Sequence, residues 1–181
     1  RAWDKRVKLL VSVNQFGTAE GAWREAIGRA PREVPLYLAL GAESGAVHTI
    51  EGCPQTFRIA QHHFDQLEQR NITATLGSFR SKLHETLQRM GAVDLAFIDG
   101  HHAKEPTLEY FEQILRFAHN GSVFVFDDIH WSRGMEQAWE VVKEHPQVTV
   151  SIDLYDVGLV FLRTEQAKEH FTLRYNRKSV V

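Results

Sequence analysis

The 181-residue sequence has one cysteine and little excess charge of either sign. A lone Cys53 excludes an intramolecular disulfide and a zinc site built from several cysteines. The 21 basic and 23 acidic residues give a net charge of −2, so the chain lacks the basic excess of nucleic-acid-binding proteins. No apolar run approaches the roughly 20 residues that span a bilayer. These absences exclude nucleic acid and membrane as the main partners.

The sequence also shows no apolar segment typical of a signal peptide behind its first residues. A cytoplasmic protein that acts on a small molecule is the simplest expectation. Hydrophobic residues make up 43% of the chain and charged residues 24%, which suits one globular domain. We therefore expect a single domain over residues 1–181.

From residue 47 onward, segments with strand and helix patterns alternate. Strands are predicted by short β-prone or apolar runs at 47–50, 72–76, 93–98 and 122–126. Amphipathic helices are predicted by apolar spacing at 56–69, 79–90, 105–118 and 135–144. Two last strands, 148–154 and 158–163, are separated by three residues, so they are antiparallel neighbours.

This order predicts an α/β fold of the Rossmann-like, doubly wound kind. We expect a mostly parallel, seven-stranded sheet that ends in an antiparallel hairpin. Ligands of such sheets bind outside the carboxyl ends of the strands. Polar clusters follow four of the predicted strands, at Glu51, 77–78, 99–102 and 127–130. Glycine, aspartate and serine also punctuate ordinary loops, but we favour a binding site.

Three segments carry a resemblance to a known family: 47–54, 93–102 and 124–131. Together they resemble class I methyltransferases that depend on S-adenosylmethionine (SAM), in the branch similar to catechol O-methyltransferase. The resemblance is good over residues 47–175 and poor over 1–46. It implies SAM as cofactor and O-methylation of a small hydroxylated molecule, and it is compatible with a homodimer.

The resemblance also implies roles for residues at the strand ends. Glu51 corresponds to the acid that accepts hydrogen bonds from both ribose hydroxyls, a task for which a carboxylate has enough acceptor positions. Gly77, Ser78 and Phe79 resemble the segment that lies along the adenine. Asp99 is assigned both to the cofactor site and to catalysis. His102 stands where metal-using relatives often have a lysine, so it is the candidate general base.

A metal site is a further expectation from the same strand ends. Asp99, Asp127 and Asp128 are predicted to converge, and carboxylates gathered in one pocket repel unless a cation or proton lies between them. Mg²⁺ or another hard divalent ion fits three oxygen ligands. His102 and His130 near the same rim equally favour a transition metal, or bind only loop backbone.

The weakest part of the resemblance is the first glycine motif. The strand pattern at 7–13, followed by Gly17 and Gly21, is one candidate for the first strand and the cofactor loop. A strand at 36–40 with the turn 41–45 is rejected, because no room remains for a crossover helix. A third interpretation is a damaged loop, so that the domain is a binding or assembly module without catalysis. A metal-dependent hydrolase is a third functional class.

Overall fold

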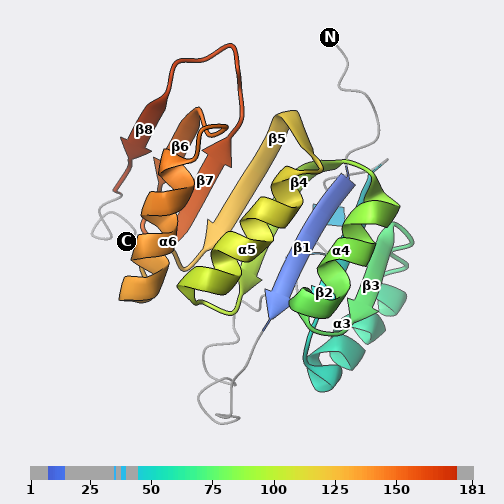
Figure 1. The fold of residues 1–181 in the computed structure, drawn as a ribbon. Coiled ribbons are helices and arrows are strands. Elements are labelled where there is room, and N and C mark those ends of the chain that lie inside the picture. The colour runs from blue at the N-terminus through green and yellow to red at the C-terminus, as the bar shows by residue number, and fades with distance from the viewer. Residues whose placement is uncertain (1–7, 15–34, 36–37, 40–44, 175–181) are drawn as a thin grey trace, which may run out of the picture.

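One eight-stranded sheet dominates the part of the chain that the computed structural model describes, namely residues 8–14, 35, 38–39 and 45–174 (Figure 1). Its strands are β1 (Lys8–Asn14), β2 (Ala46–Glu51), β3 (Ile72–Leu76), β4 (Val93–Gly100), β5 (Ala118–Asp127), β6 (Val150–Asp153), β7 (Val157–Phe161) and β8 (Glu169–Thr172). The helices are α3 (Pro54–Gln66), α4 (Phe79–Met90), α5 (Lys104–Leu115) and α6 (Arg133–Glu144).

The strand order is β3-β2-β1-β4-β5-β7-β6-β8. The strands β3, β2, β1, β4 and β5 are parallel, while β7 is antiparallel to both β5 and β6. The Rossmann-like fold with its antiparallel hairpin is therefore confirmed, but the sheet is mixed and has eight strands rather than seven. The sequence does not reveal β8, because all four of its residues are exposed and show no apolar alternation.

The first strand lies in the middle of the sheet. Residues 8–13 of β1 pair with β2 on one side, and residues 9–14 pair with β4 on the other. This confirms the strand predicted at 7–13. The rejected alternative had a strand at 36–40, but Leu38 and Ala39, the two residues of this range that the structure describes, are helical. Asn71 holds this segment in place by donating to the carbonyl oxygen of Ala39 at 3.0 Å.

The helices begin where the sequence supplies starting residues. Pro54 occupies the first turn of α3, and the hydroxyls of Ser78 and Ser132 cap α4 and α6 by accepting from backbone N–H groups. Residues 116–118 were predicted to be helical, but α5 ends at Leu115 because Ala118 already pairs with β4. In the described residues, no helix has the length and apolar character needed to cross a membrane.

Two apolar clusters show which way the strand residues point. Ile50, Ala96, Ile98, Phe124 and Phe126 belong to the main core, together with buried residues of α4, α5 and α6. Val47, Leu95 and Phe97 belong to a smaller cluster with Ala39 on the other face. Side chains alternate between the two faces along a strand, so the odd-numbered residues from Leu95 to Asp99 share the face opposite α4.

Gly158 allows close packing between β7 and α6. A Cβ at this position would lie 2.7 Å from two ring carbons of the buried Trp139 and 3.1 Å from Ile129 Cγ2. We expect Gly158→Ala to lower the free energy of unfolding by about 1–3 kcal/mol, as overpacking of a core does. Gly134→Ala is the matched control, since its Cβ would meet nothing closer than 3.7 Å. Urea denaturation that gives the two variants equal stability would contradict this explanation.

Candidate active site

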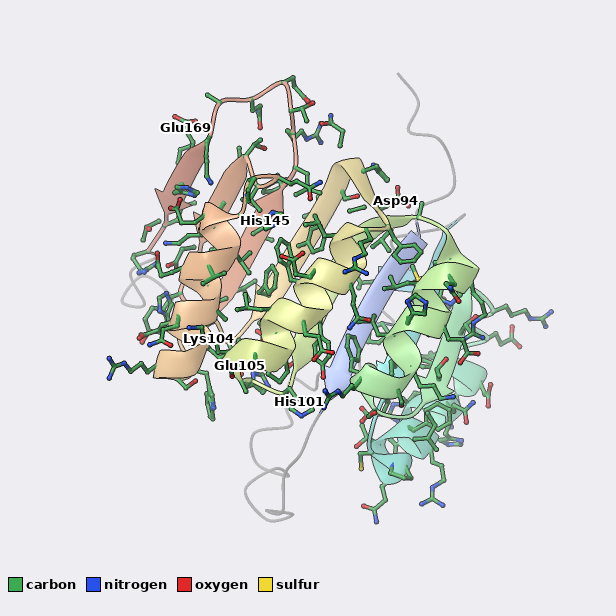
Figure 2. The ribbon with its side chains drawn as sticks, viewed as in Figure 1. Asp94, His101, Lys104, Glu105, His145 and Glu169 are labelled. Carbon is green, nitrogen blue, oxygen red and sulfur yellow. The ribbon has the colours of Figure 1, made fainter. Side chains whose placement is uncertain are left out.

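Two acidic residues flank β1 at the same level of the sheet. Val13 of β1 is paired in register with Glu51 of β2 on one side and with Asp99 of β4 on the other. Glu51 is the last residue of β2, and Asp99 is the last but one of β4. In Figure 2, His101 marks the carboxyl end of β4 and Asp94 the opposite end. The parallel strands thus bring Glu51 and Asp99 to one edge, separated by a single strand.

The acids also share one face of the sheet. Asp99 continues the series of Leu95 and Phe97, which face away from α4. Glu51 continues the series of Val47 on the same face, and a small cavity between Glu51 and α3 agrees with this direction. In β5, Phe124 and Phe126 face the main core, so Asp127 points to the same side as Asp99. Three predicted site residues therefore converge.

Glu51 is held by the turn that follows it. Its side chain is buried, and Oε1 accepts a hydrogen bond of 2.7 Å from the backbone N–H of Cys53. Burial raises the pKa of Glu51, and the backbone hydrogen bonds from Cys53 and Gly52 partly oppose this rise. An ionised carboxylate has about four acceptor positions on its two oxygens. The turn therefore fixes the side chain and leaves it with acceptor positions for a ligand.

Asp99 and Asp127 are carboxyl groups that resist ionisation. Burial raises the pKa of Asp99 to about 7, and the charges of Asp127, Asp128 and Glu51 add to the rise. Burial, together with the charge of Asp128, raises the pKa of Asp127 to about 6. Perturbed carboxyl groups of this kind concentrate at functional sites. At neutral pH this edge therefore has a group able to take up or release a proton.

His102 lies between two of these carboxylates. Its Nε2 is 3.5 Å from Asp99 Oδ1, and its Nδ1 is 3.5 Å from Asp128 Oδ2. Nδ1 is buried and makes no hydrogen bond with the described residues. The ring also approaches Trp131, at 6.3 Å between ring centroids. The structure thus places the two predicted catalytic side chains, Asp99 and His102, in contact.

The backbone at this edge is strained. His101, His102 and Asp128 have φ angles of 65°, 29° and 54°, in the left-handed region that L-residues with side chains rarely adopt. Such conformations persist only where the surrounding structure enforces them, and they cluster at functional sites. The loops after β4 and β5 therefore hold His102 and Asp128 in place at a cost in stability.

Of the other predicted cofactor residues, some lie near the acidic edge and others do not. The backbone N–H of Gly77, whose φ is 152°, donates to the carbonyl oxygen of Glu51 at 3.0 Å and so joins the ends of β2 and β3. Ser78 caps α4. Phe79 is in the main core and packs edge-on against Tyr110 at 4.9 Å between centroids, so its ring does not face the edge. Gly17 and Gly21 lie outside the described residues.

The remaining residues of the rim have partners of their own. A hydrogen bond of 3.1 Å joins His101 Nδ1 to Tyr110 Oη. Trp131 is 72% exposed, and its ring lies 6.3 Å from the ring of His102 between centroids. His130 does not join His102 but binds Asp153.

Sequence reasoning missed a second cluster at this edge, centred on Asp153. The buried carboxylate accepts hydrogen bonds from His130 Nε2 at 2.9 Å, from Arg174 Nη1 at 2.9 Å and from the N–H of Tyr155 at 2.8 Å. The ring of Tyr155 stacks on His130, and Arg174 lies over the same ring. The topology of the hairpin explains why Asp153 lies here. Because β7 is antiparallel to both β5 and β6, β6 ends at the same edge as β5.

We expect Asp153→Asn to lower the free energy of unfolding by about 1–3 kcal/mol at pH 7, because it removes the charge of a buried acceptor. Burial alone would raise the pKa of Asp153, but the hydrogen bonds from His130, Tyr155 and Arg174 hold it below its usual value. A lowered pKa stabilises the fold above the unfolded value near 3.8, and this stabilisation is lost as the pH falls through the folded value.

Urea denaturation at pH 7 and at pH 2–3 measures this difference. Asp94→Asn is the control, because the pair of Asp94 with His119, at 3.1 Å, is partly exposed at the opposite edge and should contribute less than about 1 kcal/mol. Equal losses in the two variants would show that the Asp153 cluster adds nothing special to stability.

The predicted metal ligands do not form a metal-binding set. Within the described ranges, no group of three His, Cys, Asp or Glu side chains is arranged to hold an ion. The physical reason is His102, which directs one ring nitrogen toward Asp99 and the other toward Asp128. The donor set present therefore does not fit the magnesium site expected from the resemblance.

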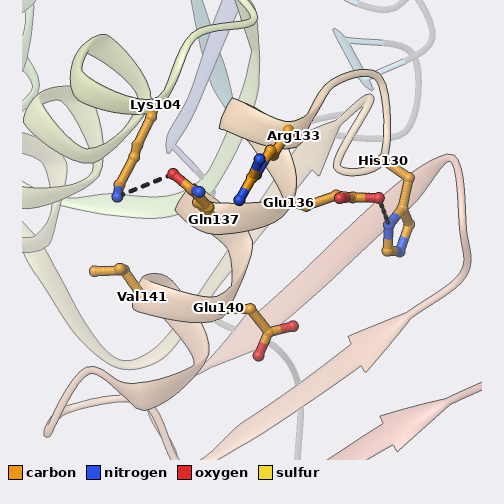
Figure 3. Close-up of a pocket in the computed structure, with 7 residues that line it drawn as sticks. All are labelled: Lys104, His130, Arg133, Glu136, Gln137, Glu140 and Val141. Carbon is orange, nitrogen blue, oxygen red and sulfur yellow. Dashed lines mark hydrogen bonds and ion pairs between the residues drawn. The ribbon is translucent and has the colours of Figure 1, made fainter.

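A shallow groove of about 500 Å³ lies over the outer face of α6 (Figure 3). It is lined by Lys104, His130, Arg133, Glu136, Gln137, Glu140 and Val141. Lys104 donates to Gln137 at 3.3 Å, and His130 lies 3.6 Å from Glu136. Two cationic and two anionic side chains balance each other in this groove, and neither Glu51 nor Asp99 is part of the lining. The groove thus adjoins the Asp153 cluster through His130 but does not include Glu51 or Asp99.

The fold is a Rossmann-like domain, and its acidic residues gather at the carboxyl ends of the parallel strands, where ligands of such sheets bind. A family model described as a methyltransferase domain matches residues 15–129, which is more than half of the chain. The chain therefore belongs to this family of methyltransferases, and its resemblance to methyltransferases is confirmed. No curated protein sequence matches the chain.

Solved structures share the fold at low sequence identity. The O-methyltransferase TomG from Streptomyces achromogenes, in complex with SAM, is 19% identical with a TM-score of 0.59, over 86% of this chain and 73% of TomG. The O-methyltransferase from Bacillus cereus, in complex with S-adenosylhomocysteine (SAH), is 18% identical with a TM-score of 0.57, over 85% and 73%. A methyltransferase from Geobacter sulfurreducens is 11% identical with a TM-score of 0.60, over 88% and 73%.

Proposed function

We propose that this protein transfers a methyl group from SAM to a hydroxyl group of a small molecule. The observation that carries the proposal is the placement of Glu51 and Asp99 on either side of β1, at one edge and on one face of the sheet. The strand between them belongs to the part where this architecture binds nucleosides. Membership of the methyltransferase family supplies the class of chemistry.

In this proposal Glu51 binds the ribose. Its Oε2 accepts hydrogen bonds from the ribose hydroxyls, while Cys53 fixes Oε1 in place. Gly77 and Ser78, at the end of the adjacent strand, contribute backbone close to the adenine. When SAM is bound, its sulfonium group supplies an electrophilic methyl group.

Asp99 and His102 prepare the acceptor. The hydroxyl oxygen forms a bond to the methyl carbon as the bond from that carbon to sulfur breaks, and the hydroxyl proton passes to His102. Asp99 orients His102 from 3.5 Å, a distance typical of catalytic pairs before substrate binds. The products are the methylated acceptor and SAH. Asp127 and Asp128 keep the edge negatively charged, which favours a cationic sulfonium over a neutral thioether.

Two measurements test the proposal. Calorimetry should show saturable binding of SAH, and mass spectrometry should show one added methyl group on members of a panel of phenols, alcohols, carboxylic acids and amines incubated with SAM. We expect products among the hydroxylated members only. Absence of heat at millimolar SAH would overturn the proposal and leave a binding or assembly module as the interpretation. Methylation of amines alone would replace the acceptor class.

A further inference from the structure

The space between Asp99 and Asp128 is filled by a side chain of this chain. His102 approaches both carboxylates with its two ring nitrogens, each at 3.5 Å. The ring is therefore in the position that a bridging cation would need. Asp99 is nearly fully buried, so it has little freedom to move toward another partner.

Ligand distances show why ring and ion exclude each other. Oxygens bind Mg²⁺ at about 2.0–2.1 Å and Ca²⁺ at about 2.3–2.6 Å. Two carboxylates that share one ion therefore have oxygens within roughly 5 Å of each other. An imidazole placed between Asp99 and Asp128 keeps these oxygens from closing on a common ion, which agrees with the absence of a metal-binding set among the described residues.

The placement of His102 is enforced by the backbone on both sides. His102 and Asp128 are in the left-handed region, with φ of 29° and 54°. This conformation costs about 1–3 kcal/mol per residue outside glycine. Strain of this size at both ends of the contact indicates that the loops after β4 and β5 are built to hold the ring there.

We propose that His102 takes the place of a divalent cation between Asp99 and Asp128, and that removing its ring opens a cation site. It follows, given the proposed function, that methyl transfer by this protein needs no divalent cation shared by Asp99 and Asp128. The difference between this protein and metal-using relatives is then due to one residue, His102.

The test uses Mn²⁺ alone as the probe. Its binding is measured by calorimetry and by the electron paramagnetic resonance signal of free Mn²⁺. The wild-type chain is compared with His102→Ala and with His102→Asp. The second variant adds an oxygen donor where the ring was. His101→Ala is the matched control, because His101 is adjacent in sequence but binds Tyr110 instead of the carboxylates. Thermal unfolding followed by circular dichroism establishes that each variant is folded.

We expect no Mn²⁺ binding by the wild-type chain or by His101→Ala below millimolar concentration. His102→Asp should bind Mn²⁺ at least tenfold more tightly, and Asp99→Asn added to it should abolish the gain. Stoichiometric micromolar binding by the wild-type chain would overturn the proposal, and so would folded His102 variants that bind no better than the wild type. These outcomes do not depend on SAH binding or on methyl transfer, so they are separate from the fate of the proposed function.

Discussion

Glu51→Ala should weaken the binding of SAH at least tenfold, as measured by calorimetry at pH 7.5. Each hydrogen bond to a charged group contributes about 1.5–3 kcal/mol when its partner would otherwise be left unsatisfied. A loss of about 1.4 kcal/mol already gives a factor of ten, so a ribose held through two hydroxyls leaves room for a larger effect. We expect a decrease between about tenfold and a thousandfold.

The control must separate the ribose contact from the turn that Glu51 stabilises. The N–H of Cys53 donates to Oε1, so the alanine variant also leaves this donor at the start of α3 without its acceptor. Glu51→Gln keeps an oxygen for Cys53 and removes the charge. It should fold like the wild type and bind SAH with intermediate affinity. Glu85→Ala, at an exposed position of α4, should change nothing.

The pH dependence of binding gives an independent reading. Burial raises the pKa of Glu51, so this carboxyl becomes protonated over a range of pH higher than that of an ordinary glutamate. A protonated carboxyl has fewer acceptor positions, and the affinity for SAH should fall over this range in the wild type but not in Glu51→Gln. Unchanged affinity of Glu51→Ala for SAH would remove this residue from the cofactor site.

The fold beyond residue 47 was largely predictable from the sequence because its signals are local. The apolar run at 122–126 and the amphipathic spacing at 79–90 each specify an element without reference to the rest of the chain. The strand at 7–13 is different. Its residues specify a strand, but its place between β2 and β4 depends on pairing with segments about 40 and 85 residues away.

The candidate site was partly predictable for a related reason. Parallel strands end at one edge, so acids that follow strands come together, and Glu51, Asp99 and Asp127 do. Which carboxylates share an ion is not a matter of topology. Whether two carboxylates share an ion depends on the rotation of His102 into the space beside Asp128. This rotation follows from positive φ angles, which the residue types in this loop do not predict.

Asp153 was missed for a different reason, because the sequence contained part of the information that places it at this edge. The three-residue link in the hairpin predicted that β6 and β7 are antiparallel, and because β7 is antiparallel to β5, β6 runs in the direction of β5. An acid at its end therefore belongs to the same edge as Asp127. Arg174 had no such signal, because its contact with Asp153 depends on β8, whose exposed residues carry no strand pattern.

The second large effect concerns stability, and it has an unusual sign: Asp99→Asn should make the protein more stable at pH 8. Burial and three neighbouring carboxylates raise the pKa of Asp99 to about 7, against 3.8 in an unfolded chain. A group with a raised pKa stabilises the fold fully below the unfolded value, and this contribution is lost as the pH rises through the folded value. Each pKa unit corresponds to about 1.4 kcal/mol, which sets an upper limit near 4 kcal/mol.

His102, 3.5 Å from Asp99, offsets part of this cost, so we expect a gain of about 1–3 kcal/mol at pH 8. Urea denaturation in the presence of a chelator, from pH 4 to pH 8, measures it. The gain should shrink toward pH 4, because Asp99 is then protonated in the fold and already partly protonated in the unfolded chain, whose value is 3.8. Asp94→Asn should show no such trend. The same substitution should abolish methyl transfer, since residues arranged for function are often costly to stability. A variant less stable than the wild type at pH 8 would mean that the carboxylate of Asp99 is stabilised in the fold, and that a cation, rather than repulsion, governs this edge of the sheet.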